Sequence, residues 1–307
     1  MTALPGFRPG STSSRSLLTR LRRNWPAYLF LLPTLLLVGY FAYYPAYIAV
    51  TRAFTDWDGL NAPTFTGLEN FQRAVTDPVM GQATTNMAIW VVLGTALALL
   101  MPLLAAELVF HLRGRRRQYA YRTLFVIPIV IPSLVLLLVW GSFYRSDGLL
   151  NQLLGAVGLG GLRHEWLSDP HTALYALILL GFPYIDAFNF LLLYAGLQAI
   201  PEDVFEAAKI DGATGLRRVF RIDLPLLRPQ LGLIAVLAII GNVQYFTSAL
   251  VLTSGGPGFS TTVPALLMYY TATRDGEYGY AMSIAVLLMV LVVALTLLSR
   301  LISRGNR

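Results

Sequence analysis

Long apolar segments alternate with short polar ones along this chain of 307 residues. A helix that crosses a membrane needs about 20 mostly apolar residues. Because lipid offers backbone groups no water partner, such segments must be helical. Six segments are long enough, with predicted bounds 27–50, 83–109, 123–144, 171–196, 229–252 and 278–302. The pattern predicts an all-α membrane protein with six transmembrane helices, in which 25–302 form one domain between tails at 1–24 and 303–307.

The charged residues predict how these helices are oriented. Only 13% of the residues are charged, whereas a soluble domain usually has about 25%. If the N-terminus is cytoplasmic, every Lys and Arg falls in an inner segment except Arg52, Arg73, Arg145, Arg163 and Arg274. Basic residues favour the cytoplasmic side, so we expect both ends of the chain to lie inside. The tail at 1–24 is then expected to rest loosely on anionic lipid.

Six prolines lie within the predicted helices. Proline removes a backbone donor and bends a helix, and neighbouring helices in a membrane can satisfy the freed groups. The positions are Pro33, Pro45, Pro102, Pro128, Pro132 and Pro183. We expect packing kinks there, or hinges that bend as the protein changes state.

Several kinds of chemistry are excluded by residue type. The chain has no Cys, so it has neither a disulfide framework nor a thiolate metal site. Its three His residues form no metal-binding motif, and Lys209, the one Lys, is followed by Ile210 rather than the Ser or Thr of a phosphate-binding loop. We therefore expect no metal, no nucleotide and no enzymatic reaction on this chain. Its basic residues lie beside apolar segments, so they do not indicate a nucleic-acid partner.

A polar stretch at 197–228 separates the fourth and fifth predicted helices. Pro201 suits the first turn of a helix, acidic residues follow it, and Gly212 suits the end. This predicts a short helix at 201–211, a second at 213–221, and a break at Leu224-Pro225. The first helix has a small apolar face that fits a cleft in a soluble partner. The alternative is an amphipathic linker lying on the membrane.

This stretch resembles the cytoplasmic coupling loop of ABC importer permeases. The resemblance rests on Glu-Ala-Ala at 206–208, Asp-Gly at 211–212, Ile-x-Leu-Pro at 222–225 and Pro229. It implies a membrane gate of the MetI-like fold, driven by a separate ATPase. The residues implied in coupling are Val204, Phe205, Glu206, Ala207, Ala208, Asp211, Gly212, Ile222, Leu224 and Pro225.

A second stretch, 251–262, resembles the outer loop of maltose-type and glycerol-phosphate-type permeases. Its core is Leu-Thr-x-Gly-Gly-Pro at 252–257, followed by Thr-Thr at 261–262. The resemblance implies that Gly255, Gly256 and Pro257 face an extracytoplasmic binding protein. The chain departs from many relatives at Thr247 and Leu250, so no specific sugar is implied.

Together these resemblances imply a multi-subunit sugar importer in the bacterial cytoplasmic (inner) membrane. Its other parts would be a second homologous permease, two ATPase subunits that bind ATP and Mg, a solute-binding protein, and surrounding lipid. This chain would be a multi-pass subunit that forms half of the pathway. A permease for a solute other than a sugar remains an alternative.

Polar residues inside a membrane are costly and often functional. The candidates for the solute pathway are Tyr184, Asp186, Asn189, Asn242, Gln244 and Tyr245. They can also serve as hydrogen bonds between helices, and Asp186 can pair with an Arg. Glu107 is expected to form an ion pair with Arg113 or Arg115.

Two other classes of protein compete with this interpretation. A secondary transporter would carry carboxylates in several spans and repeated, broken helices, whereas Asp186 is the one clear acid predicted at mid-span. A membrane enzyme would need a cluster of His, Cys or acidic residues.

Overall fold

The computed structural model describes residues 25–304, so the predicted tail at 1–24 and residues 305–307 lie outside the described part of the chain. The chain divides into two units, residues 1–51 and 52–307. In the first unit, α2 (Trp25–Val38), a π turn (Gly39–Tyr43) and α3 (Tyr44–Arg52) follow one another as an apolar helix. The wide π turn contains Phe41, four residues before Pro45, whose ring would clash with the carbonyl at that position in a regular α-helix.

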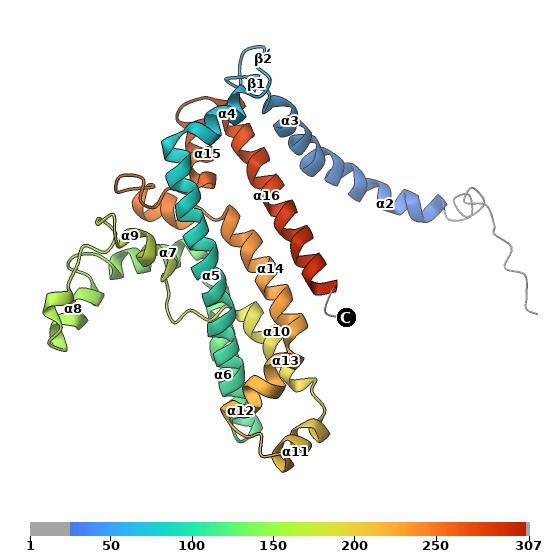
Figure 1. The fold of residues 1–307 in the computed structure, drawn as a ribbon, viewed down its shortest axis with the longest axis vertical. Coiled ribbons are helices and arrows are strands. Elements are labelled where there is room, and N and C mark those ends of the chain that lie inside the picture. The colour runs from blue at the N-terminus through green and yellow to red at the C-terminus, as the bar shows by residue number, and fades with distance from the viewer. Residues whose placement is uncertain (1–24, 305–307) are drawn as a thin grey trace, which may run out of the picture. The chain divides into compact units, whose positions relative to one another are not determined.

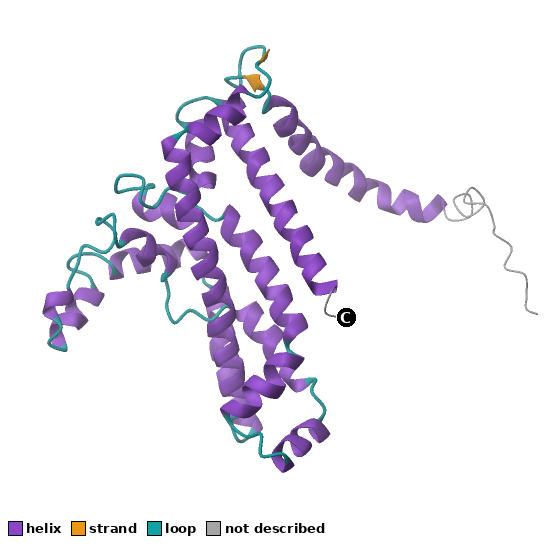
Figure 2. Ribbon diagram, viewed as in Figure 1, coloured by secondary structure: helices purple, strands orange, loops and turns teal. Residues whose placement is uncertain are grey.

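The second unit is almost entirely helical, apart from one short hairpin (Figures 1 and 2). Strands β1 (Thr55–Asp56) and β2 (Thr64–Phe65) pair antiparallel, with Thr55 opposite Phe65. The α-helices are α4 (Glu69–Thr76), α5 (Pro78–Phe110), α6 (Arg115–Val126), α7 (Ser133–Phe143), α8 (Leu149–Ala156), α9 (Ala173–Ile178), α10 (Ala187–Gln198), α11 (Glu202–Ile210), α12 (Leu216–Arg218), α13 (Leu224–Leu226), α14 (Arg228–Gln244), α15 (Pro264–Thr273) and α16 (Tyr278–Arg304). Shorter 3₁₀ or π turns are η2 (Ile127–Val130), η3 (Gly160–Leu162), η4 (Val219–Asp223) and η5 (Ala249–Thr253).

Four described helical segments are long and apolar enough to cross a membrane: Tyr28–Arg52, Pro78–Phe110, Arg228–Thr253 and Tyr278–Ser299. A fifth arises if α6 with η2 and α7, which meet at a bend of 95°, form one span. The bend coincides with Pro128 in η2 and Pro132 before α7, two of the predicted kink positions. The mostly helical character is thus confirmed, with the short hairpin as the exception to the all-α prediction, whereas the count of six spans stays a prediction.

The fourth predicted helix, 171–196, is not continuous. It is divided into α9 and α10 by a non-helical stretch at 179–186. Gly181 adopts a φ of +82°, which residues other than glycine rarely adopt, and Pro183 lacks the backbone donor that a helix needs. The sequence prediction was wrong here because apolar residues continue through the break.

Helix α5 is the central element of the second unit and packs against α10 and α14 (Figure 1). One buried cluster surrounds its second half: Ala105, Ala106, Val109, Phe190, Leu193, Tyr194, Leu197, Leu227 and Ile234. Another surrounds its first half: Met87, Trp90, Leu174, Leu177, Val243, Ala249, Val263 and Leu266. The two clusters hold the helices together on either side of the segment of α5 that lines a cavity.

The polar stretch at 197–228 folds partly as predicted. Helix α11 covers Glu202–Ile210, in agreement with the helix expected at 201–211. The second helix begins only at Leu216, because Gly215 takes a φ of +55° and a ψ of −135°, a conformation favoured by glycine. The predicted break at Leu224-Pro225 is absent: η4 widens the turn before Pro225 and the helical path continues into α13 and α14.

Candidate substrate cavity and coupling loop

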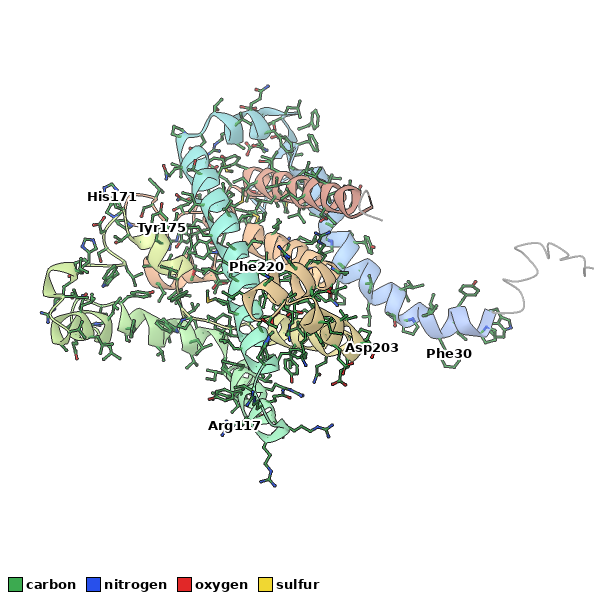
Figure 3. The ribbon with its side chains drawn as sticks, turned by 60° about the horizontal axis from the view of Figure 1, so that its bottom comes forward. Phe30, Arg117, His171, Tyr175, Asp203 and Phe220 are labelled. Carbon is green, nitrogen blue, oxygen red and sulfur yellow. The ribbon has the colours of Figure 1, made fainter. Side chains whose placement is uncertain are left out.

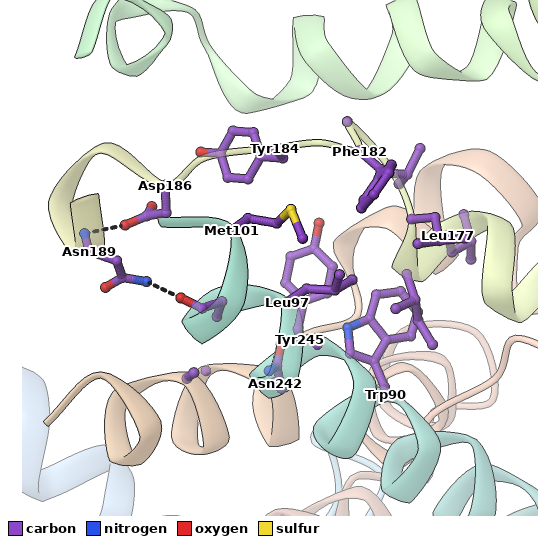
Figure 4. Close-up of a pocket in the computed structure, with 18 of the residues that line it drawn as sticks. Trp90, Leu97, Met101, Leu177, Phe182, Tyr184, Asp186, Asn189, Asn242 and Tyr245 are labelled. Atoms are coloured by element: carbon purple, nitrogen blue, oxygen red, sulfur yellow. Dashed lines mark hydrogen bonds between the residues drawn. The ribbon is translucent and has the colours of Figure 1, made fainter. Parts of the chain in front are cut away.

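A cavity of about 640 Å³ lies among five helical segments of the second unit. Its walls come from α5, α7, α9, α10 and α14, and from the non-helical stretch between α9 and α10. Figure 4 shows Tyr184 and Asp186 on one side of this space and Trp90 and Asn242 on the other. The volume is in the range typical of small-molecule sites, and the lining is mainly apolar with a few polar groups, as is usual for such sites.

The break in the fourth segment shapes one wall of the cavity. Residues 179–182, Tyr184 and Asp186 all line it, and they belong to the non-helical stretch. Irregular backbone at membrane depth is tolerated where it lines a water-filled cavity. The break therefore places an irregular stretch of backbone and the acidic side chain of Asp186 at the wall of the cavity.

Asp186 has a structural role that the sequence does not reveal. It is the N-cap of α10, and its Oδ1 accepts a hydrogen bond from the backbone N–H of Asn189 at 2.8 Å. The side-chain amide of Asn189 in turn donates to the Ala98 carbonyl of α5 at 3.4 Å (Figure 4). The pair thus fixes the start of α10 against α5 while both side chains border the cavity.

Asn242 and Tyr245 occupy the opposite wall on α14 and at its end. The Asn242 amide donates to the Thr95 hydroxyl of α5 at 3.3 Å. This close approach requires Gly94, because a Cβ there would lie 2.9 Å from the Asn242 amide nitrogen. The rings of Tyr245 and Trp90 lie 5.5 Å apart, which forms an aromatic surface at this end of the cavity.

Five of the six predicted pathway residues line this cavity, and Gln244 does not. Gln244 is exposed, because two residues of helix turn its side chain away from the face of Asn242. Gln244 therefore stays a prediction for the pathway that this cavity does not support. The predicted set did not include Trp90, Met101, Trp140 and Phe182, which line the cavity. Apolar and aromatic residues inside apolar segments give no sequence signal that separates a cavity wall from a packed core.

The arrangement can bind a polar solute without covalent chemistry. It offers carboxylate, amide and hydroxyl groups for hydrogen bonds, and aromatic faces for the apolar side of a ligand. Within the described residues no group of three or more His, Asp or Glu residues is placed to hold a metal ion.

Helix α11 ends as its sequence predicts. Gly212 has a φ of +69°, and the N–H of Ala213 donates to the Ala208 carbonyl at 2.8 Å. These features are typical of a helix that ends in a left-handed turn at glycine. Helices α11 and α12 lie at the opposite end of the second unit from β1 and β2 (Figure 1).

The apolar face predicted to enter a partner packs instead on the chain itself. Ala208 is buried, Val204 and Phe205 are half-buried, and the Phe205 ring lies 5.7 Å from that of Phe110 on α5. Ile222, Leu224 and Pro225 are likewise half-buried. These residues hold α11 and the following turn in place.

A different set of side chains faces outward from this loop. Glu206, Ala207, Asp211 and Gly212 are exposed. Three large apolar side chains accompany them: Ile210 is 87% exposed, Leu216 75% and Phe220 66%. Phe220 and Asp203 are visible at the end of the unit that comes forward in Figure 3, where Arg117 extends from α6. Exposed apolar residues mark a contact surface where they form a contiguous patch, so these three are candidates for one.

The stretch at 251–262 forms a tightly bonded loop. The hydroxyls of Thr261 and Thr262 donate to the carbonyls of Gly256 and Gly255, both at 2.9 Å. Gly255 has a φ of +86°, and a Cβ there would lie 2.5 Å from the Thr262 hydroxyl oxygen. The amide of Asn86 on α5 donates to the Thr262 carbonyl at 2.8 Å. The glycines of the motif therefore permit the fixed conformation of this loop.

Glu107 does not pair with Arg113 or Arg115 as predicted. Its carboxylate lies 3.6 Å from Nδ1 of His111, and the charges of Asp223 and Arg218 act on it. The prediction was wrong because α5 ends at Phe110, so the following arginines turn away into solvent, where they are exposed.

Helices long and apolar enough to cross a membrane, a cavity among them and a structured loop at one end are features that a membrane transport protein would need. The family model of binding-protein-dependent transport system inner membrane components matches residues 98–307. The chain therefore belongs to this family. It is a multi-pass membrane permease subunit of an ABC importer and not an enzyme.

Individual comparisons agree with this assignment. The trehalose/maltose transport system permease protein MalF of Thermococcus litoralis is 34% identical over 91% of this chain and 94% of its own length. The sulfoquinovosyl glycerol transport system permease protein SmoG of Agrobacterium fabrum is 31% identical over 88% of this chain and 87% of its own length. A solved bacterial alginate ABC transporter, in complex with an alginate pentasaccharide-bound periplasmic protein, has the same fold, with a TM-score of 0.82 and 22% identity over 94% of this chain and 98% of the matched chain.

Proposed function

We propose that this chain imports a sugar or sugar derivative as one of two permease subunits of an ATP-driven transporter. The observation that carries the proposal is the cavity of about 640 Å³, which combines Asp186, Asn189 and Asn242 with aromatic side chains. Sugars present hydroxyl groups to such polar residues and apolar ring faces to such aromatic residues. The names of similar proteins, which specify trehalose, maltose and sulfoquinovosyl glycerol, support this substrate class.

In this proposal the chain has six transmembrane helices with both ends in the cytoplasm of a bacterium. The third helix is α6 with α7, and the fourth is α9 with α10. The loop that contains α11 then lies inside, and the loop at 251–262 lies outside. The clustering of Arg residues just before α6 and in its first turn supports this orientation, because basic residues favour the cytoplasmic side.

The proposed partners meet the chain at these two loops. An ATPase subunit contacts Glu206, Ala207, Asp211 and Gly212 together with the exposed side chains of Ile210, Leu216 and Phe220. A binding protein delivers solute at the loop of Gly255, Gly256 and Pro257. ATP and Mg bind to two ATPase copies, and a second permease supplies the other half of the pathway.

In this cycle α11 carries the movement of the ATPase to the permease. Phe205 rests on Phe110 at the end of α5, and α5 lines the cavity from Trp90 to Pro102. Displacement of α11 would therefore move a wall of the cavity. Solute entering from the outside would exchange water for hydrogen bonds with the cavity wall, then leave to the inside when α11 returns.

Co-purification tests the proposal. The chain is tagged at its C-terminus, extracted gently from its native membrane, and its companions are identified by mass spectrometry. A second permease with an ATPase supports the assembly, and the binding protein that goes with them is then screened against a panel of mono- and disaccharides. Recovery of the chain alone or as a homo-oligomer would contradict the assembly, and a binding protein that retains only amino acids or ions would contradict the substrate class.

A further inference from the structure

A buried group of charged side chains lies at the C-terminal end of α5, where α5 contacts α11, away from the solute cavity. Asp223 in η4 is completely buried, and the side chains of Glu107 on α5 and Arg218 on α12 are 9% and 15% exposed. Two acids and one guanidinium are thus gathered where α5 meets the coupling loop. Buried charges are retained at a cost in stability, so a structural or functional reason for them is expected.

Arg218 connects three separate elements. Its Nε donates to Oδ2 of Asp223 at 3.0 Å. Its guanidinium lies over the Phe205 ring of α11, 4.6 Å from the centroid, and 5.7 Å from that of Phe110 at the end of α5. A cation over aromatic faces is held there by electrostatic attraction. A movement of α11 therefore acts directly on Arg218.

The hydrogen bonds of this group are incomplete. Both carboxylate oxygens of Glu107, Oδ1 of Asp223 and Nη2 of Arg218 lack a hydrogen-bond partner among the described residues. The ionisable groups near Glu107 are Arg218, Asp223 and the His111 ring, whose Nδ1 bonds the Glu107 backbone carbonyl at 2.7 Å. Guanidinium has five N–H donors, so Arg218 has the capacity to bond either acid.

We propose that Arg218 exchanges its carboxylate partner during transport, from Asp223 in the described arrangement to Glu107 when α11 moves. The exchange rests on the proposed coupling function. It makes Arg218, Asp223 and Glu107 positioning residues that give the contact between α11 and α5 two preferred arrangements. An element with two discrete arrangements is what coupling between distant sites requires.

The path from this group to the solute is short and continuous. Glu107 and the cavity residues Met101 and Ala98 belong to the same uninterrupted helix α5. A change in the pairing of Glu107 therefore biases the position of a helix that forms one cavity wall. The pairing of Glu107 thus links the position of the coupling loop to the shape of the solute cavity.

The test compares Glu107→Gln and Asp223→Asn in the assembled importer, purified with its partners. The rate of ATP hydrolysis per complex is measured in the presence and absence of the binding protein. We expect each variant to lower the stimulation by the binding protein about fivefold or more, the lower end of typical coupling between sites. Asp203→Asn and Arg217→Gln, at exposed neighbouring positions, serve as matched controls and should retain the wild-type stimulation.

Glu107→Gln separates the exchange from a purely structural role. The Glu107 carboxylate accepts no hydrogen bond from a described residue, so its replacement by an amide of equal size removes no hydrogen bond and leaves only the 3.6 Å approach to His111 altered. Wild-type stimulation in Glu107→Gln, with or without a defect in Asp223→Asn, would overturn the exchange. If the wild-type chain does not co-purify with an ATPase at all, the proposed function fails instead, which keeps the two outcomes distinct.

Discussion

A methyl group at position 94 tests a close helix contact in the cavity wall. Gly94 on α5 faces Asn242 on α14, and a Cβ there would lie 2.9 Å, 3.0 Å and 3.1 Å from the amide nitrogen, oxygen and carbon of Asn242. Real Cβ atoms rarely approach other atoms so closely, so Gly94→Ala must displace the amide. The displacement breaks the 3.3 Å hydrogen bond from Asn242 to Thr95.

The expected cost has two contributions. Crowding of a packed helix contact typically costs about 1–3 kcal/mol, and an interhelical hydrogen bond in a membrane is worth about 0.6 kcal/mol on average. A loss of this size lowers the apparent unfolding temperature by a few degrees, since 1 kcal/mol corresponds to about 2–4 °C in a domain of 150–250 residues. Because Asn242 lines the cavity, the solute concentration for half-maximal uptake should also rise.

A double-mutant cycle assigns the effect to this contact. Asn242→Ala removes the atoms that the new methyl group meets, so Gly94→Ala should cost much less in that background. Gly241→Ala is the control: Gly241 also lines the cavity, but a Cβ there has no atom within 4 Å. Thermal unfolding of the purified protein is followed for all variants. An equal cost of Gly94→Ala with and without Asn242 would refute the reasoning.

Three further predictions concern other parts of the chain. Gly212→Trp should abolish uptake while membrane levels stay normal, because Gly212 holds a φ of +69° in the exposed end of α11; uptake assays with immunoblotting check this. Asp186→Asn should change solute affinity with little loss of stability, since Asn also caps helices well, whereas Asp186→Ala should cost about 1 kcal/mol; binding and unfolding are measured on both. In the turn at 164–171, hydrogen bonds from the backbone N–H of His171 and from the His164 side chain lower the pKa of Asp169 below its ordinary 3.8. The turn should therefore stay ordered above pH 3.8 and loosen as the pH falls through the lowered pKa. Hydrogen exchange of the His171 amide measures this loosening.

Hydrophobic patterning predicts the helices of this chain well where each segment is uninterrupted. Segments at 83–109, 229–252 and 278–302 correspond to α5, to α14 with η5, and to α16. The loop helix α11 was also predictable, because Pro201 and Gly212 are local signals at its two ends. Local signals of this kind need no information about the rest of the fold.

The failures arise where the outcome depends on tertiary contacts. The direction in which Val204, Phe205 and Ala208 face could not be deduced, because an apolar helix face is compatible with the chain's own core or with a partner. The residues of the cavity wall that are apolar, such as Trp90 and Trp140, have the same sequence signature as core residues. The Arg218–Asp223 pair joins residues whose side chains face each other only because η4 is a π turn.

The break between α9 and α10 also bears on the competing interpretation as a secondary transporter, which was expected to contain broken helices. Family membership assigns the chain to ABC importers, so the break needs another physical reason. Some backbone groups in this stretch find partners in turns, such as the N–H of Phe182, which donates to the Leu179 carbonyl at 3.0 Å. The same stretch lines the cavity, and irregular backbone at membrane depth is tolerated where it lines a cavity. The break also ends at Asp186, the cap of α10, and so places a carboxylate at the cavity in addition to the amides of Asn189 and Asn242.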